Sequence, residues 1–215
     1  MEIKRTANAG ILLKLDGVKI LMDGVCNAEY PYLGTPDQLR TALLQDAPDA
    51  LLITHRHEDH YDATFVSDYL QKAAGPVLGP ADIPFCDVQT AAAGNVRITP
   101  IPSRHIGKTE PMGHVSFVLQ GTKCVWFTGD ASPLQWKNRE DLPKPDVLIA
   151  PYAYAIGSGW EITKALMPQT VILLHLPEKD ADPYRLWQAV EDTTGQGNGP
   201  KLYLPAVGQS VAFAE

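Results

Sequence analysis

Several features are scarce or missing in this chain of 215 residues. No apolar run approaches the ~20 residues needed to cross a bilayer, so the sequence predicts no membrane-spanning helix. The three cysteines, Cys26, Cys86 and Cys124, are widely spaced and form no CxxC pair. Their spacing favours reduced thiols in the core over a disulfide framework or a cysteine-based zinc site. The first residues carry no signal-peptide apolar segment, and we expect a cytoplasmic protein.

Positive charge is also in deficit. The chain has 18 Lys and Arg against 25 Asp and Glu, which gives a net charge of -7. Nucleic acids are bound largely through their phosphates by electropositive surfaces, so this balance disfavours a nucleic-acid partner. Because no membrane partner is expected either, we expect a small-molecule substrate, and the oligomeric state stays open.

The remaining composition is that of an ordinary globular protein. Hydrophobic residues make up 45% and charged residues 20% of the chain, which excludes a disordered or fibrous protein. No repeat, low-complexity tract or linker divides the sequence. We therefore expect a single domain over residues 1–215, long enough to bury roughly 70% of its unfolded surface.

Apolar segments and turn residues predict strands with helices between them. Asp16-Gly17 predicts a hairpin over 11–22, because Asp-Gly is a favoured two-residue turn. Further strands are predicted at 49–53, 77–78, 96–99, 115–119, 123–127, 147–149, 171–174, 202–204 and 210–213. Helices are predicted at 35–44, 62–73, 158–166 and 183–190, the first with Thr35 as its N-cap. This order is typical of sheets covered by helices.

Three of the six histidines lie in one short stretch, Thr54-His55-Arg56-His57-Glu58-Asp59-His60, directly after a predicted buried strand. Imidazole and carboxylate groups are ligands of zinc and similar ions. His55 and His57 are two positions apart, so in extended backbone they point to the same side. Asp59 and His60 follow where the chain turns. The stretch therefore predicts ligands for two neighbouring divalent ions that hold a hydroxide between them.

Three further candidates each follow a predicted strand. They are His105, Asp130 in Thr128-Gly129-Asp130, and His175. Polar residues at the ends of apolar strands are poor core builders and good ligands. His114, which opens the next strand, is an alternative to His105, but the strand-end position favours His105. His114 would then line the pocket or make a structural hydrogen bond at the start of its strand.

The same residues resemble the ligand motifs of the metallo-β-lactamase superfamily. The stretch 54–60 is similar to its HxHxDH signature, and the three later candidates follow in the order of its later motifs. The short layout most resembles the branch of small metal-dependent hydrolases that includes the ascorbate-6-phosphate lactonase-like proteins. This resemblance implies an α/β protein with an αββα sandwich, in which helices flank two mixed sheets and the site lies at one edge.

The resemblance also implies how two divalent ions share the ligands. It assigns three residues to the first ion: His55, His57 and His105. It assigns three others to the second ion: Asp59, His60 and His175. Asp130 bridges the two, and Asp59 is in addition the catalytic residue that orients the nucleophile and moves its proton. Zinc is the metal that we expect, with manganese or iron as alternatives for the same nitrogen and oxygen ligands.

Residues beside these motifs have two interpretations each. Asp23 resembles an aspartate that supports the ligand loop, but Asp-Gly also suits a turn at the end of a strand. Three cations lie beside ligand motifs and would bind a carboxylate or phosphate if they are not surface charges: Arg56, Arg104 and Lys108. The neighbours of Arg56 face the metals, which turns its own side chain away. Tyr152 and Tyr154 either reach the site with their hydroxyls or pack in the core.

The expected function is a hydrolase that uses a hydroxide bridging two metals on a small ester, lactone or phosphoester. No G-x-S-x-G elbow indicates a serine nucleophile. The alternatives are a nuclease or phosphodiesterase of the same fold and a non-catalytic metal-binding relative. A diiron oxygen reductase is disfavoured, because it would be expected to have a glutamate in place of His57 and a flavin domain.

Overall fold

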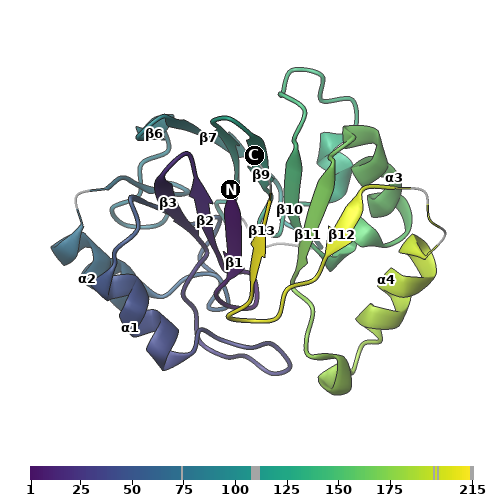
Figure 1. Ribbon diagram of the computed structural model, residues 1–215, viewed down its shortest axis with the longest axis horizontal. Coiled ribbons are helices and arrows are strands. Elements are labelled where there is room, and N and C mark those ends of the chain that lie inside the picture. Colours follow the sequence, from purple (N-terminus) through teal and green to yellow (C-terminus); the bar gives the residue numbers. More distant parts are fainter. Residues whose placement is uncertain (74, 108–111, 196, 198, 214–215) are drawn as a thin grey trace.

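The computed structural model describes residues 1–73, 75–107, 112–195, 197 and 199–213. Within these residues the strands form a six-stranded sheet and a seven-stranded sheet, and helices lie outside both (Figure 1). The prediction of an αββα sandwich of two mixed sheets is confirmed.

The first sheet is built from the N-terminal part of the chain and its last strand. Its strands are β1 (Glu2–Arg5), β2 (Ile11–Leu15), β3 (Val18–Met22), β4 (Ala50–Leu52), β5 (Val77–Leu78) and β13 (Ser210–Ala212), in the order β13-β1-β2-β3-β4-β5. The hairpin of β2 and β3 forms as predicted. The strands β3, β4 and β5 run parallel, so their carboxyl ends share one edge of the sheet.

The second sheet is built from the rest of the chain. Its strands are β6 (Ala91–Ala93), β7 (Val96–Pro102), β8 (Val115–Gln120), β9 (Cys124–Phe127), β10 (Val147–Pro151), β11 (Thr170–Leu174) and β12 (Lys201–Tyr203), in the order β12-β11-β10-β9-β8-β7-β6. The strands β9 to β12 are parallel, and β7 and β9 both run antiparallel to β8. The carboxyl ends of β7, β9, β10 and β11 therefore also meet at one edge.

The main core fills the space between the sheets. Its fully buried side chains include Ile3, Ile11, Leu13, Phe117, Phe127, Ile149 and Ile172. Every residue of β4 and β11 is buried, because helices cover the other face of each sheet. This packing makes the strands a rigid base for the loops that follow them.

The helices lie on the two outer faces. The pair α1 (Asp37–Gln45) and α2 (Ala63–Lys72) covers the first sheet, and α3 (Gly157–Leu166) and α4 (Leu186–Thr194) cover the second (Figure 1). Three short 3-10 helices connect elements of the second half: η1 (Pro133–Trp136), η2 (Tyr152–Ala155) and η3 (Lys179–Ala181). No helix in the described part of the chain is long and apolar enough to cross a membrane.

Two predicted helix starts were wrong. Pro36, not Thr35, is the N-cap of α1, because the Thr35 hydroxyl donates to the Gly24 carbonyl oxygen instead of reaching into the helix. The helix predicted from 183 begins at Leu186. Arg185 adopts a left-handed conformation with a φ of 54°, and this turn delays the helix.

Candidate metal centre

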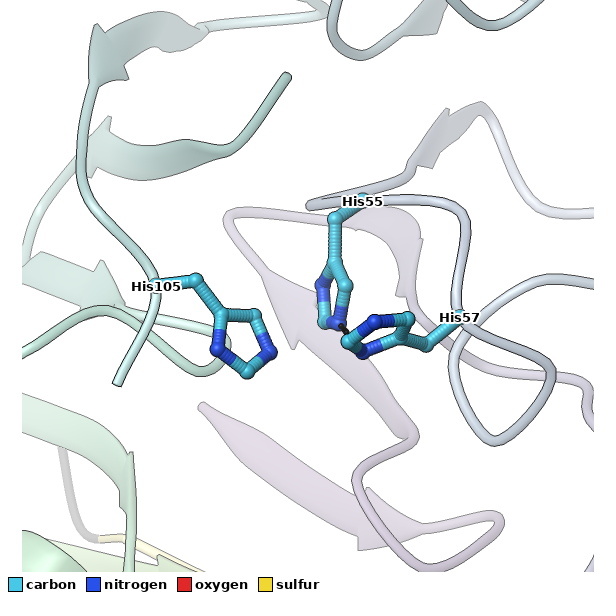
Figure 2. Close-up of side chains that lie close together, drawn as sticks. All are labelled: His55, His57 and His105. Atoms are coloured by element: carbon cyan, nitrogen blue, oxygen red, sulfur yellow. Dashed lines mark hydrogen bonds between the residues drawn. The ribbon is translucent and has the colours of Figure 1, made fainter. Parts of the chain in front are cut away.

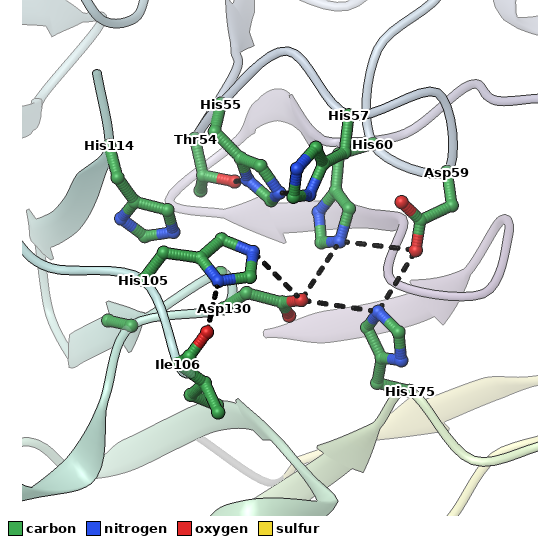
Figure 3. Close-up of polar contacts among 12 residues, drawn as sticks. Thr54, His55, His57, Asp59, His60, His105, Ile106, His114, Asp130 and His175 are labelled. Atoms are coloured by element: carbon green, nitrogen blue, oxygen red, sulfur yellow. Dashed lines mark hydrogen bonds and ion pairs between the residues drawn. The ribbon is translucent and has the colours of Figure 1, made fainter. Parts of the chain in front are cut away.

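The candidate site lies where the carboxyl ends of strands from both sheets meet (Figure 3). β3 is followed by Asp23, β4 by the stretch 54–60, β7 by His105, β9 by Asp130 and β11 by His175. The parallel arrangement of these strands brings together residues that lie far apart in the sequence. All seven predicted ligands are in this cluster.

Three histidines form what we call the first group: His55, His57 and His105. One ring nitrogen from each lies within 4.8 Å of the others. His55 Nε2 is 2.9 Å from His57 Nδ1, and His105 approaches them from the opposite sheet (Figure 2). Burial lowers the pKa of His55 and that of His57. The two rings are therefore neutral at pH 7 and offer lone pairs to a cation.

Three other residues form what we call the second group: Asp59, His60 and His175. Their ligand atoms also lie within 4.8 Å of one another. Asp59 Oδ2 is 3.0 Å from His175 Nε2 and 3.5 Å from His60 Nε2. Burial would raise the pKa of Asp59, but the contact with His175 outweighs it and lowers the pKa to about 2. Asp59 is therefore an anion at pH 7.

Asp130 lies between the two groups. Its Oδ2 atom is 3.3 Å from His175 Nε2 and 3.6 Å from both His60 Nε2 and His105 Nε2 (Figure 3). Although burial opposes ionisation, the contacts with His175 and His60 hold the pKa of Asp130 well below its ordinary value. One carboxylate oxygen thus faces nitrogen ligands of both groups, as a bridging ligand requires.

Hydrogen bonds behind the first ligands orient His55 and His60. Asp23 accepts from Thr54 Oγ1 at 2.5 Å and contacts His60 Nδ1 at 2.8 Å. Because the Thr54 hydroxyl donates to Asp23, its oxygen accepts from His55 Nδ1 at 2.9 Å. In both histidines Nδ1 then carries the outward proton and Nε2 faces the site. The geometry favours the supporting role for Asp23.

Each group holds a buried ring nitrogen that lacks a hydrogen bond to any described residue. These atoms are His105 Nε2 in the first group, and His60 Nε2 and both ring nitrogens of His175 in the second. The Ile106 carbonyl oxygen accepts from His105 Nδ1 at 2.6 Å, which makes Nδ1 the donor and leaves Nε2 with the lone pair. Burial would lower the pKa of His60, but Asp130 and Asp23 raise it well above its ordinary value. The site therefore attracts positive charge, and these nitrogen and oxygen donors suit zinc, manganese or iron.

Two contributors have no signal in the sequence. Asn8, in the loop between β1 and β2, donates from its side-chain amide to Asp59 Oδ2 at 3.3 Å. The backbone carbonyl oxygen of Asn8 accepts from the backbone amide of His175 at 3.3 Å and from the buried Arg5 guanidinium at 3.0 Å. Tyr32 packs its ring edge-on against His175, with centroids 4.8 Å apart. No local pattern marks these residues, because the fold alone brings them to the site.

The structure separates His105 from its alternative, His114. The ring of His114 lies 4.9 Å from that of His55 and 5.7 Å from that of His105, between centroids. It belongs to neither group of close ligand atoms among the described residues. Burial lowers the pKa of His114 to about 3. The position of His105 agrees with the interpretation that favoured it.

The flanking residues differ in their relation to the site. The Arg56 side chain is 58% exposed and 3.7 Å from Asp82, in keeping with the prediction that it turns away. Tyr152 lies 6.4 Å from His175 between ring centroids. Tyr154 is fully buried and donates its hydroxyl to the Ala131 carbonyl oxygen, so its interpretation as a pocket residue was wrong.

Of the other two cations next to ligand motifs, the structure describes only Arg104. Arg104 is exposed, and its backbone amide donates to the Gln135 side chain. Lys108 lies outside the described residues.

Comparisons with known proteins show which proteins this chain is similar to. A metal-dependent hydrolase of Methanopyrus kandleri is 24% identical over 219 residues, which cover 89% of this chain and 92% of the relative. The solved structure of a metallo hydrolase from Ignicoccus hospitalis has a TM-score of 0.68 at 19% identity, covering 100% of this chain and 98% of the other. The solved structure of the isothiocyanate hydrolase from Delia radicum gut bacteria has a TM-score of 0.70 at 18% identity, covering 100% of this chain and 99% of the other. These two structures share the fold.

The family is shown by a match over most of the chain. The family model described as a beta-lactamase superfamily domain matches residues 2–175, a range that contains all seven candidate ligands and ends on His175. The family resemblance inferred from the sequence is therefore confirmed, and the protein belongs to the metallo-β-lactamase superfamily.

Proposed function

We propose that the protein is a metal-dependent hydrolase that holds two divalent ions and acts on a small ester, lactone or phosphoester. The carrying observation is that two groups of ligand atoms, each within 4.8 Å, lie on either side of Asp130. Zinc is the simplest occupant, and manganese or iron would suit the same donors. Two such ions would act as Lewis acids and supply hydroxide at neutral pH.

Asp59 is the residue best placed to handle a proton. Its Oδ2 atom is held by Asn8 and by the rings of His175 and His60. Its Oδ1 atom makes no hydrogen bond to the residues that the structure describes, and Figure 3 shows it directed away from those contacts. One oxygen therefore stays with the ligands while the other is available to accept a proton and later release it.

Relatives support the hydrolytic reaction. The Methanopyrus kandleri protein is named a metal-dependent hydrolase, and the two solved structures of the same fold are named as hydrolases. The chain covers almost the whole length of each of them, so their named activities belong to the region that this chain resembles. A small substrate fits the net charge of -7, which disfavours polyanionic nucleic acids.

The test begins with metal content. Purified protein reconstituted with zinc, manganese or iron is analysed by plasma mass spectrometry and assayed on p-nitrophenyl acetate, γ-butyrolactone and bis-p-nitrophenyl phosphate. We expect about two equivalents of metal per chain and hydrolysis that a chelator abolishes and added metal restores. DNA and RNA serve as substrates for the nuclease alternative.

The variant that tests the role of Asp59 is Asp59→Ala. It should abolish hydrolysis while circular dichroism shows the fold intact. In the wild-type protein, binding of less than about one equivalent of metal would contradict the two-ion site. Two equivalents without turnover of any substrate would instead identify a metal-binding relative that is not an enzyme.

A further inference from the structure

His114 lies beside the first group without belonging to it. The residue is 5% exposed, and its Nε2 atom is buried and makes no hydrogen bond to the described residues. A buried polar atom without a partner costs free energy, and such atoms are uncommon in native proteins. In Figure 3 the ring lies next to His55 and His105, at the edge of the cluster of candidate ligands.

A chain of hydrogen bonds determines which nitrogen of His114 carries the proton. Ser116 donates its hydroxyl proton to the Thr128 carbonyl oxygen at 2.9 Å. Its oxygen therefore accepts the proton of Ser103 across 3.0 Å. Ser103 has then used its single proton, and its oxygen accepts from His114 Nδ1 at 2.7 Å. Nδ1 is protonated, and Nε2 presents a lone pair.

The position of this lone pair separates His114 from the ligands. His55, His60 and His105 also direct Nδ1 to an outer partner, and each of these residues belongs to a triad of close ligand atoms. Among the described residues, neither nitrogen of His114 joins such a triad within 4.8 Å. The atom is therefore an acceptor of fixed direction, set back from the ligands.

We propose that His114 Nε2 accepts a hydrogen bond from an O–H or N–H donor bound beside the first group. The inference rests on the proposed function, because that donor would belong to the substrate or to water held next to it. A fixed acceptor beside the first group would favour binding of substrates that carry a hydroxyl or amide next to the scissile bond over substrates that lack one.

The first test asks whether His114 is an acceptor or a ligand. His114→Phe keeps the ring and removes both nitrogens, and His105→Ala is the matched ligand variant. We expect His114→Phe to retain about two equivalents of zinc and His105→Ala to retain about one. A loss of metal from His114→Phe would overturn the proposal, since the residue would then be a ligand.

The second test reads the ring nitrogens directly and needs no substrate. In the zinc-loaded protein, ¹H–¹⁵N NMR of the histidine rings should show His114 protonated at Nδ1, with Nε2 shifted as a nitrogen that accepts a hydrogen bond. Ser103→Ala removes the hydroxyl that accepts from His114 Nδ1, so the proton should no longer be confined to Nδ1, while residue 114 itself is unchanged. A protonated Nε2, or an Nε2 resonance typical of a nitrogen without a partner in both the free and the product-bound protein, would overturn the proposal.

The third test identifies the source of the donor. p-Nitrophenyl acetate is compared with p-nitrophenyl glycolate, which adds one hydroxyl next to the carbonyl. If the substrate is the donor, His114→Phe lowers kcat/KM about three- to tenfold for the glycolate alone. If water is the donor, both esters lose the same factor, and unchanged kinetics on both would contradict the proposal. If wild-type protein hydrolyses neither ester, the proposed function fails while the NMR test still decides the role of His114.

Discussion

The first and second groups lie side by side but differ in charge. The first group consists of three imidazoles, and the second contains the carboxylate of Asp59. Within the second group Asp59 Oδ2 lies 3.0 Å from His175 Nε2, whereas the described ion pairs give the first group a carboxylate only through Asp130, 3.6 Å from His105 Nε2. The second group is thus partly neutralised by its own members, and the first group is not.

Because the first group has no carboxylate of its own, a metal ion bound there would depend on the charge of Asp130. A divalent ion held by three imidazole nitrogens alone would keep its full charge in a buried site, which is costly without a nearby anion. Asp130 Oδ2 is 3.6 Å from His105 Nε2 and is the carboxylate oxygen nearest to that ring in the described ion pairs. The first group therefore depends on a residue that it shares, and the second group has a carboxylate of its own.

The largest effect is expected from Asp130→Asn. Both ions lose a shared negative ligand, so metal content should fall below about one equivalent. Hydrolysis should fall by more than about a hundredfold, because even the partners of metal ligands are typically worth about 10–100-fold. Plasma mass spectrometry and the ester assay measure the two quantities. Asp141→Asn, in an exposed pair with Arg139, is the control, and full metal content in Asp130→Asn would refute the shared-ligand comparison.

A second pair of variants separates the groups. His105→Ala removes a ligand of the first group, and Asp59→Ala removes the carboxylate of the second. Each should retain about one equivalent of zinc, with the ion in the other group. Cobalt substitution followed by visible spectroscopy would distinguish which site remains occupied. Identical spectra for the two variants would show that the ligands do not form two separate sets.

A smaller effect is expected from Asp23→Asn. The carboxylate of Asp23 holds His60 directly and His55 through Thr54, so it supports one ligand in each group. Metal affinity should fall about 10–100-fold with the ligands themselves intact. Competition with a chromophoric chelator measures this loss. Asp16→Asn removes a carboxylate that binds Thr122 far from the site, and equal losses in the two variants would contradict the role of Asp23.

The two sheets differ in how much of the site could be predicted from the sequence. The first sheet contributes four ligands within residues 54–60, directly after an apolar strand, and this local pattern is visible without a fold. The second sheet contributes three single residues, His105, Asp130 and His175, each at the end of a different strand. Their grouping depends on parallel strands, so the sequence needed the family resemblance to connect them.

Of the residues that contact the ligands from behind, Asp23 was offered by the family resemblance, but Asn8 could not be predicted. Asn8 reaches Asp59 across 51 positions, and nothing near Asn8 in the sequence marks it as a partner of a ligand. His114 was weighed as a ligand because of its residue type, while its true surroundings depend on the hydroxyls of Ser103 and Ser116. The positions of most strands along the chain were predictable from apolar segments and turn residues, but side-chain contacts across the two sheets are set by tertiary packing.

Two glycines with left-handed backbone, Gly129 and Gly17, differ in what surrounds them. Gly129, just before Asp130, has a φ of 51°, and a Cβ atom there would lie 2.6 Å from the Thr54 side chain. Gly17, in the β2–β3 turn, has a φ of 84° with nothing within 4 Å of its Cβ position. Gly17→Ala therefore measures left-handed strain alone, about 1 kcal/mol of unfolding free energy.

Gly129→Ala adds a steric clash to the same strain. Its unfolding free energy in urea should fall by about 3 kcal/mol, because overpacking costs about 1–3 kcal/mol beyond the strain. The clash pushes on Thr54, whose oxygen orients His55, so zinc affinity of the first group should fall as well. Gly17→Ala should leave zinc affinity unchanged. If both variants lose equal stability and neither loses zinc, the close approach of Gly129 to Thr54 does not position the ligands, and the two sheets are held together by their core alone.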